Sequence, residues 1–419
     1  GCFVSTIISN IFIYVFNPIN TLDMFEINKK LGYYTVNGIE FDSKIQACFF
    51  AQEKNAKVKW HFNDIVFKTY NWENEPQLSL DQLYDLRAKQ LRDTYDYIIL
   101  SYSGGSDSQN IVESFIRQGL HLDEIIVNTM EKANYKHTII DPNNKDPRNA
   151  AAEHYLQTIP RLKEIEKRSP KTKITILDMS DYLFESWLSA GDASWIMDKK
   201  EGLNPLNVTR FNYIHFDETR KKFDRSKKLA LVLGIEKPRT FIHSNGDFYI
   251  RFNDRSTNII TIENHIKEYD NSTVEYFYWA PESIDILCKQ AHVIKKWLEL
   301  NPNKQQYWYG KNMTADLFRT MHERELRPIL YSTWDNSWYQ ADKATLDWYS
   351  EFDSWYIEGH KGTKHHDIWK QGIDYVSKHA SNFINKDHGF EDGLQIHSVN
   401  YRVTKMNSEI NADQLLWHK

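Results

Sequence analysis

A short turn, Ser103-Gly104-Gly105-Ser106-Asp107-Ser108, stands at the centre of the stretch Tyr95–Thr129. The run Tyr97–Leu100 before it is short, apolar and branched, which is typical of a buried strand. Apolar residues at helical spacing follow the turn at positions 111–116, and Ile125–Val127 predicts a second buried strand. The two strands should therefore be parallel, with a right-handed crossover between them.

The residue types of this turn suit the binding of an anion. Gly104 and Gly105 allow a sharp turn and leave no Cβ to obstruct a ligand. The first amides of the following helix have no intrahelical partner, so they can donate to phosphate oxygens. Further hydroxyl donors are Ser103, Ser106 and Ser108. Asp107 suits this place if magnesium accompanies the phosphates. The alternative is a serine-rich turn in which Asp107 only caps the helix.

The turn resembles the Ser-Gly-Gly-x-Asp-Ser motif of the PP-loop, or N-type, ATP pyrophosphatases, and residues 103–108 match every fixed position. That superfamily includes the synthetase domain of asparagine synthetase, the 7-cyano-7-deazaguanine synthases and the phosphoadenylylsulfate reductases. The resemblance covers about a third of the chain and assigns no subfamily. It implies a HUP-type, doubly wound parallel α/β sheet with ATP at the carboxyl ends of its strands. It also implies cleavage of ATP between the α and β phosphates.

The composition of the 419-residue chain disfavours several classes of protein. The length allows two or three domains. A formal net charge of −5 gives no general electrostatic basis for nucleic-acid binding. The three cysteines form no CxxC pair, which argues against a disulfide framework or a zinc ribbon and fits a reducing cytoplasm. Sulfur transfer is disfavoured for the same reason, although Cys288 alone could still act.

We expect three parts in the chain. They are a small α+β lead-in at residues 1–75, the nucleotide-binding domain at residues 76–240, and a mixed, aromatic-rich substrate or cover domain at residues 241–419. The apolar run Phe3–Phe16 lacks a basic n-region and is too short to span a bilayer. We interpret it as a buried strand or as a leader outside the domain. The region before the turn is too short for a glutaminase domain.

The lead-in has local signals for each of its elements. Asn37-Gly38 between two apolar runs predicts a hairpin. A helix should follow at residues 43–54, and then strands at Val58–Phe62 and Ile65–Tyr70. A capping box at Ser79 should begin a helix that delivers the chain into the first strand of the sheet.

Two segments between residues 131 and 181 should lie near the carboxyl edge of the sheet. Residues 131–149 are polar and predict a long loop. Arg148 should begin a helix that is interrupted near Pro160; it could bind phosphate, but an exposed cap position is favoured. Ile174–Leu177 predicts the third strand. The polar residues after it either hold metal or substrate or cap the next helix. These are Asp178, Ser180 and Asp181.

The run Leu229–Gly234 ends at a glycine and could close a helix or form a buried strand. A parallel strand is favoured, because the basic loop after it would then face the same ligand edge as the turn. Lys237 and Arg239 in that loop are candidates for binding the β and γ phosphates. The alternative is a solvated basic turn.

The C-terminal part is rich in aromatic residues. Asn245-Gly246 predicts another hairpin, and Pro281 should open a helix that ends at Asn301-Pro302. The later aromatic residues, Trp334 and Trp338 among them, either cover the nucleotide or pack a core. A cluster of three histidines has no known metal-site spacing, so a solvated loop is favoured. They are His360, His365 and His366.

These observations predict an enzyme that uses ATP and magnesium to adenylate a small molecule, for which a nucleobase derivative fits the aromatic composition. Asp107 would hold the magnesium, and Lys237 would neutralise charge on the departing pyrophosphate. Ammonia or an amine would then displace AMP. One alternative is a reductase that binds an adenylyl-sulfate, although a C-terminal cysteine motif is missing. The other is a non-catalytic nucleotide-binding module. A homodimer is compatible with each.

Overall fold

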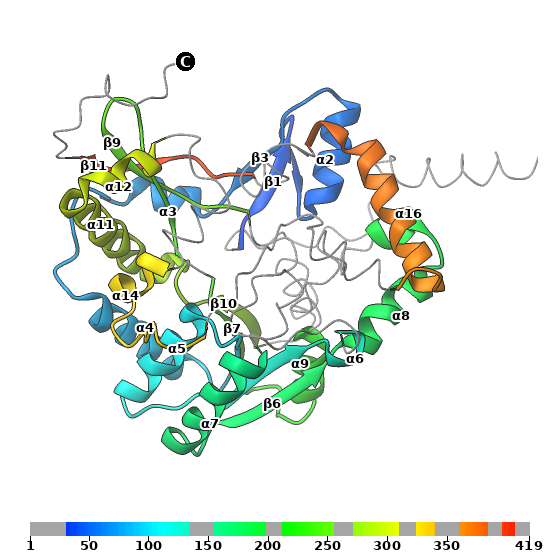
Figure 1. Ribbon diagram of the computed structural model, residues 1–419, viewed down its shortest axis with the longest axis horizontal. Helices are drawn as coiled ribbons and strands as arrows, with labels where there is room; N and C mark the ends of the chain where they lie inside the picture. The colour runs from blue at the N-terminus through cyan, green and yellow to red at the C-terminus, as the bar shows by residue number, and fades with distance from the viewer. Residues whose placement is uncertain are drawn as a thin grey trace, which may run out of the picture.

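The computed structural model describes residues 31–134, 154–197, 212–235, 237–254, 271–309, 324–339, 360–383 and 396–406. Within these residues it contains three β-sheets, and Figure 1 shows how helices surround the largest one. Several features of the sequence lie outside the described residues. They are the apolar run Phe3–Phe16, positions 135–149 of the predicted loop with Arg148, and Cys2, the first of the three cysteines.

The largest sheet has the strand order β10-β7-β4-β5-β6, and all its neighbouring strands are parallel. The bounds are β4 Tyr97–Ser101, β5 Glu124–Thr129, β6 Lys173–Asp178, β7 Leu229–Leu233 and β10 Ser272–Tyr276. The α/β class and the parallel strands predicted around the turn are therefore confirmed. The run at 229–234 is a strand and not a helix end. β10 lies beyond residue 240, so the sheet takes an edge strand from the part predicted as the C-terminal domain.

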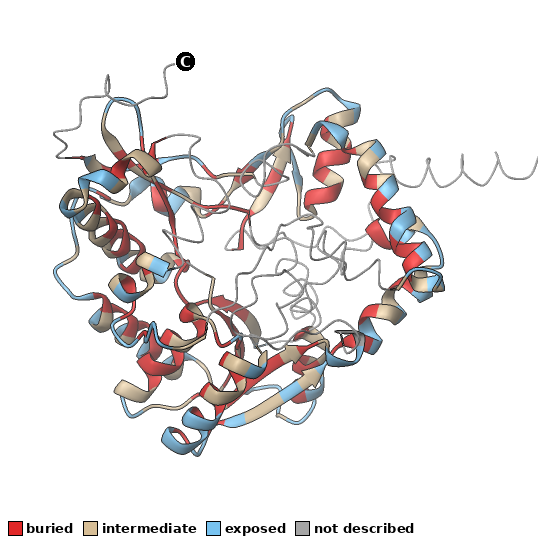
Figure 2. Cartoon of the chain, in the orientation of Figure 1, coloured by how far each residue is buried: buried red, intermediate tan, exposed pale blue. Residues whose placement is uncertain are grey.

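The order of this sheet reverses beside β4. The chain runs outward from β4 to β5 and β6, and it then returns to β7 on the other side of β4. In open α/β sheets, ligands bind at the carboxyl ends of the strands next to such a reversal. Every residue of β7 is buried, whereas the edge strand β6 has no buried residue (Figure 2). The sheet thus forms a rigid base for the turn that follows β4.

The helices next to the sheet begin and end largely where local signals place them. α4 (Leu80–Thr94) starts at the predicted capping box, in which the Ser79 hydroxyl accepts from the Gln82 amide at 3.2 Å. α5 (Ser106–Arg117) is followed by Gly119 at φ +64°. α6 (Glu131–Asn134) occupies the start of the predicted loop. The other helices are η3 (His154–Thr158), α7 (Ile159–Arg168), α8 (Ser180–Ala190), η4 (Ala193–Met197) and α9 (Asn212–Arg220).

One prediction for this region is confirmed and one needs correction. The predicted helix is divided near Pro160, since the π-helix η3 ends at Thr158 and α7 begins at Ile159 with Pro160 in its first turn. The polar stretch at 131–149 is not a loop from its start, since α6 follows β5 after a single residue.

The lead-in forms a three-stranded antiparallel sheet of β1 (Tyr33–Val36), β2 (Ile39–Phe41) and β3 (Lys59–His61). The hairpin is confirmed, with Asn37 at φ 49° and Gly38 at φ 83°. The predicted helix is α2 (Lys44–Glu53), capped by Ser43. The predicted strand Ile65–Tyr70 is wrong, because these residues form α3 (Asp64–Thr69). Its branched residues do not enter a sheet: Ile65 is 85 % exposed, and Phe67 alone is buried.

A third sheet joins residues 239–251 to the last strand of the described chain. Its order is β11-β9-β8, with β8 Arg239–Ile242, β9 Asp247–Arg251 and β11 Tyr401–Lys405. The hairpin at Asn245-Gly246 is confirmed by pairing of β8 with β9. Aromatic residues of this region and of the lead-in pack in one buried cluster that includes Phe62, Phe67, Phe252 and Tyr401. These aromatic residues pack a core.

The remaining helices complete the core. The predicted helix after Pro281 is confirmed as η6 (Pro281–Ser283) and α11 (Ile284–Leu300). After it come α12 (Pro302–Gln305), η7 (Gln306–Trp308), α14 (Arg327–Leu330), α16 (Lys364–His379) and η10 (Ser381–Phe383). The predicted solvated loop around the histidines is wrong from residue 364 onward. Thr363 caps α16 there, and the helix packs on α8 and η4 through Trp187, Trp195 and Trp369.

Candidate functional site

The turn of residues 103–108 connects β4 directly to the amino end of α5. Gly104 has φ +78°, a backbone conformation that other residues rarely adopt. A Cβ at this position would lie 2.6 Å from Thr158 Oγ1 and 2.9 Å from Thr158 Cα. Gly105 is extended and precedes the first helical residue, Ser106. The sequence therefore needs glycine at 104 both for the conformation and for the close approach of η3.

Hydrogen bonds within the turn fix its shape. The Ser103 hydroxyl accepts from the Gly105 amide at 3.2 Å. The Ser108 hydroxyl accepts from the Ser103 amide at 3.3 Å and donates to the Gly105 carbonyl at 3.2 Å. Ser106 is 2 % exposed, and its hydroxyl has no hydrogen-bond partner among the described residues. The hydroxyls of Ser103 and Ser108 thus order the loop itself.

Asp107 lies in the first turn of α5 and meets Lys237 from the loop after β7. Lys237 Nζ is 2.8 Å from Asp107 Oδ1 and 3.0 Å from Oδ2. The Lys237 side chain is 4 % exposed, whereas that of Asp107 is 23 % exposed. Gly234, in the same loop, packs on the start of α5, where a Cβ would lie 3.4 Å from the Ser108 amide nitrogen. The structure therefore brings Lys237 to the turn, as the sequence predicted.

Two tyrosines complete the surroundings of Asp107. The Tyr331 hydroxyl donates to Asp107 Oδ1, and the Tyr278 hydroxyl donates to the Asp107 carbonyl oxygen at 2.8 Å. Burial and the negative charge of Asp107 raise the pKa of both phenols well above the usual value for tyrosine. Both therefore remain proton donors at neutral pH. No pattern in the sequence indicated them, since they lie among many other aromatic residues.

Residues of η3 and α7 hold the other side of the turn. The Gly104 carbonyl accepts from Gln157 Nε2 at 2.5 Å and from Arg161 Nη1 at 2.6 Å. The guanidinium carbon of Arg161 lies 4.2 Å and 4.6 Å from the ring centroids of Trp334 and Trp338. Arg161 is 4 % exposed. The sequence did not predict that this arginine binds the Gly104 carbonyl, because a basic residue within an amphipathic helix has no distinctive pattern.

Arg239 belongs to a different neighbourhood from Lys237. It begins β8 and pairs across the ladder with Arg251 of β9. Burial, followed by the charges of these two arginines, lowers the pKa of His397 to about 3. The role of Arg239 in phosphate binding stays a prediction, whereas Lys237 contacts the turn directly.

The carboxylates after β6 act in local structure. Asp178 accepts from the Ser180 amide at 2.9 Å, as a helix cap does, and from the Lys132 amide at 2.9 Å. Asp181 pairs with the exposed ammonium of Lys132. Within the described ranges, no group of three His, Cys, Asp or Glu residues is placed to hold a metal ion. Neither Ser180 nor Asp181 caps α8, because its N-cap is Met179 and the Ser180 amide donates to Asp178.

The histidines and cysteines do not converge on the turn. The ring centroid of His365 lies 4.2 Å from that of Phe184, and burial together with neighbouring His360 lowers the pKa of His365 to about 4. Cys48 and Cys288 are both fully buried. Burial raises the pKa of each thiol to about 12. These thiols are poorly suited to nucleophilic chemistry.

No family model matches the chain, and no curated protein matches its sequence. In the part of the chain that the structure describes, none of the helices is long and apolar enough to cross a membrane.

Proposed function

We propose that this chain is an ATP-dependent enzyme that cleaves ATP to AMP and pyrophosphate and adenylates a small molecule. The observation that carries the proposal is the meeting of Asp107 with Lys237 at the amino end of α5, directly after a glycine turn. Helix amides, an ammonium and hydroxyls gathered at one point suit a polyphosphate. The family resemblance of residues 103–108 supports the same function.

A second lysine–aspartate pair shows what a purely structural version looks like in this chain. Lys44 Nζ lies 2.7 Å from Asp254 Oδ2, and the Tyr34 hydroxyl donates to the same oxygen at 3.0 Å. Both charged side chains of that pair are 0 % exposed. Asp107 has equivalent tyrosine and lysine partners but keeps 23 % of its surface exposed. This exposure favours a ligand-binding role for Asp107.

The proposed reaction has two steps. An oxygen of the substrate attacks the α-phosphorus of ATP, the bond from that phosphorus to the α–β bridging oxygen breaks, and pyrophosphate leaves with that oxygen. Ammonia or an amine then attacks the substrate carbon that bears the adenylated oxygen. The bond from this carbon to the oxygen breaks, AMP leaves with the oxygen, and the nitrogen loses a proton to water. Lys237 and the amides of α5 would stabilise the charge that develops on the pyrophosphate.

The residues present fit a magnesium ion only together with phosphate oxygens. Magnesium usually binds through one or two carboxylates plus substrate phosphates, and Asp107 offers one partly exposed carboxylate. Lys237 now neutralises both oxygens of this carboxylate, so its ammonium would have to turn toward the phosphates for magnesium to bind at Asp107. Asp107 would hold the ion. When bound, magnesium would neutralise phosphate charge.

The finer fold assignment is part of the proposal. The strand order β6-β5-β4-β7-β10 supports a HUP-type sheet, since β4 is central and the order reverses beside it. We also propose that Arg239 binds phosphate and that the substrate resembles a nucleobase. A homodimer and a cytoplasmic location are part of the same proposal. Sulfur transfer is disfavoured, because the Cys288 thiol is buried and its pKa is raised. The same observation disfavours the reductase alternative.

The test is product analysis with the full chain, ATP and magnesium. AMP and pyrophosphate are the expected products. Nucleobases, nucleotides and amino acids are then screened with ammonia, and one of these classes should stimulate pyrophosphate release. ADP and phosphate would contradict the proposal. ATP binding without any product would favour a non-catalytic module. In a parallel assay with an adenylyl-sulfate and a dithiol as the two-electron reductant, AMP with sulfite would favour the reductase. Stimulation by DNA or tRNA alone would contradict the small-molecule substrate.

A further inference from the structure

We infer that residues 326–338, here called the strap, position the turn of residues 103–108 by contacts at two points. The strap contains α14 and the irregular segment that follows it. One contact is with Asp107, and the other is with Arg161, which binds the Gly104 carbonyl. The inference rests on the proposed function and adds Tyr331 and Arg161 as positioning residues of the same site.

The first contact orients the Asp107 carboxylate. The Tyr331 hydroxyl donates to Asp107 Oδ1, and the Tyr331 ring centroid lies 5.5 Å from Lys237 Nζ. Tyr331 is itself fixed between Tyr84 and Tyr278, whose ring centroids are each 5.9 Å away. A carboxylate that accepts from a fixed donor has fewer orientations available. Tyr331 therefore restricts the orientation in which the Asp107 carboxylate would meet the proposed ATP.

The second contact orients the Gly104–Gly105 peptide. Arg161 Nη1 donates to the Gly104 carbonyl at 2.6 Å, and the Arg161 guanidinium lies against Trp334 and Trp338 of the strap. A planar guanidinium that contacts aromatic rings has a restricted orientation, which a lysine cannot reproduce. The carbonyl in turn fixes the peptide that leads into α5. Both ends of the turn thus depend on the strap.

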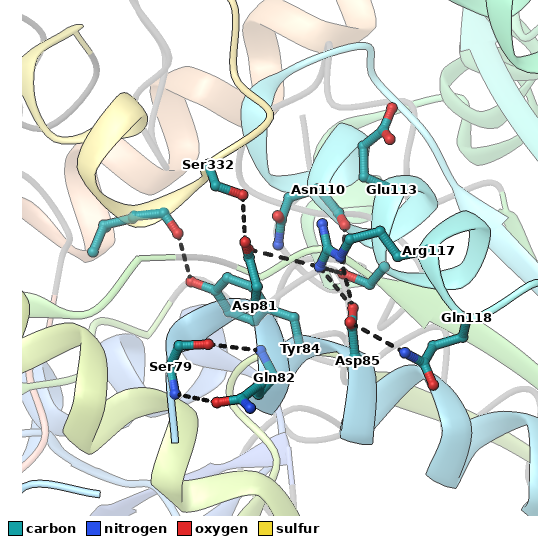
Figure 3. Close-up of polar contacts among 12 residues, drawn as sticks. Ser79, Asp81, Gln82, Tyr84, Asp85, Asn110, Glu113, Arg117, Gln118 and Ser332 are labelled. Atoms are coloured by element: carbon teal, nitrogen blue, oxygen red, sulfur yellow. Dashed lines mark hydrogen bonds and ion pairs between the residues drawn. The ribbon is translucent and has the colours of Figure 1, made fainter. Parts of the chain in front are cut away.

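The strap also contacts α4, the helix that leads into β4 of the parallel sheet. The Ser332 hydroxyl donates to Asp81 Oδ2 at 2.6 Å, and the Tyr84 hydroxyl donates to the Leu330 carbonyl at 3.0 Å. Figure 3 shows Ser332 above Asp81, with Arg117 of α5 beside Asp81 and Asp85 of α4. Because Tyr331 and Ser332 are consecutive, one segment reaches both Asp107 and α4. The strap therefore acts by holding Asp107 and Arg161 in place, and it does not itself have to contact the nucleotide.

This arrangement predicts a specific kinetic effect. Misplacing groups that bind a transition state lowers kcat, whereas ground-state affinity changes less. Tyr331→Phe keeps the ring and removes only the donor to Asp107. Arg161→Lys keeps the charge and removes the planar fork. The matched control is Tyr34→Phe, which removes a buried phenol that donates to another lysine-paired aspartate, Asp254.

Three measurements on the full chain test the inference. They are kcat and KM for pyrophosphate release, the Kd of α,β-methylene-ATP, and hydrogen–deuterium exchange of residues 103–108 without nucleotide. We expect Tyr331→Phe to lower kcat about 10- to 100-fold while KM and Kd change less than about threefold. Exchange at the turn should rise in Tyr331→Phe and Arg161→Lys. It should not rise there in Tyr34→Phe.

The opposite results are distinct from failure of the proposed function. Unchanged exchange at the turn in both variants would overturn the inference, whatever the activity. A general rise in exchange through the whole chain would show that the contacts serve only stability, which would also overturn it. If the unaltered chain releases no pyrophosphate and does not bind the analogue, the proposed function fails. The exchange comparison then still decides whether the strap positions the turn.

Discussion

Lys237 Nζ lies 2.8 Å and 3.0 Å from the two carboxylate oxygens of Asp107, although the residues are 130 positions apart in the chain. The pair joins the loop after β7 to the first turn of α5 across the reversal in strand order. Lys237 is almost fully buried, and Asp107 is partly exposed. The two partners should therefore respond differently when the pair is broken.

We expect Asp107→Asn to destabilise the protein by about 2 kcal/mol and Lys237→Met to destabilise it less. Removing one partner of a buried ion pair leaves the other charge without compensation, and the more buried charge suffers more. Here that charge is Lys237. Urea unfolding of both variants and of the double variant measures the coupling. Additive losses would show that the two side chains do not interact in solution.

Much of this site could be predicted from local sequence, and the rest could not. The turn, its flanking strands and α5 follow from apolar periodicity and two glycines, and Lys237 follows from a strand that ends at Gly234. Tyr331 contacts Asp107 at a separation of 224 residues, and neither it nor Arg161 stands in a distinctive pattern. Their roles arise from packing of distant elements. The error at Ile65–Tyr70 has a different cause, because branched residues also occur in a short exposed helix.

Gly104→Ala should destabilise the protein by about 3 kcal/mol. An alanine there must adopt φ +78°, and its Cβ would also lie within 3 Å of two atoms of Thr158. Gly119→Ala is the matched control at the other end of α5, with φ +64° and no atom within 4 Å of the added Cβ. It should cost about 1 kcal/mol. Thermal denaturation compares the two; equal losses would show that the contact with η3 is unimportant.

Glu124 should make the protein more stable above about pH 4.5 than at lower pH. Burial opposes its ionisation, but hydrogen bonds from His215, Lys173 and Thr175 outweigh this and lower the pKa to about 2. A lowered carboxyl pKa stabilises the fold above the unfolded-state value, and this stabilisation is lost as the pH falls toward 2. Glu124→Gln should cost about 2 kcal/mol at pH 6 and less at pH 3. A cost that does not vary with pH would contradict the assignment.

The thiols of Cys48 and Cys288 should not react with iodoacetamide at pH 8 in the folded protein. Both side chains are buried, and burial raises the pKa of each to about 12, so little thiolate forms. Peptide mass spectrometry after labelling measures each site separately, and labelling in urea serves as the control. Rapid modification of Cys288 in the folded state would reopen sulfur chemistry at this position.

Lys237→Met should weaken the binding of ATP about tenfold or more, about 1.4 kcal/mol, and leave the binding of AMP nearly unchanged. The reason is that the proposed partners of Lys237 are the outer phosphates, which AMP lacks. Lys227→Met is the matched control, since Lys227 pairs with Asp96 before β7 begins, at the opposite end of that strand. Titration calorimetry with both nucleotides gives the comparison. Equal weakening of ATP and AMP binding would place Lys237 away from the β and γ phosphates, and weakening by Lys227→Met would show an effect of charge alone.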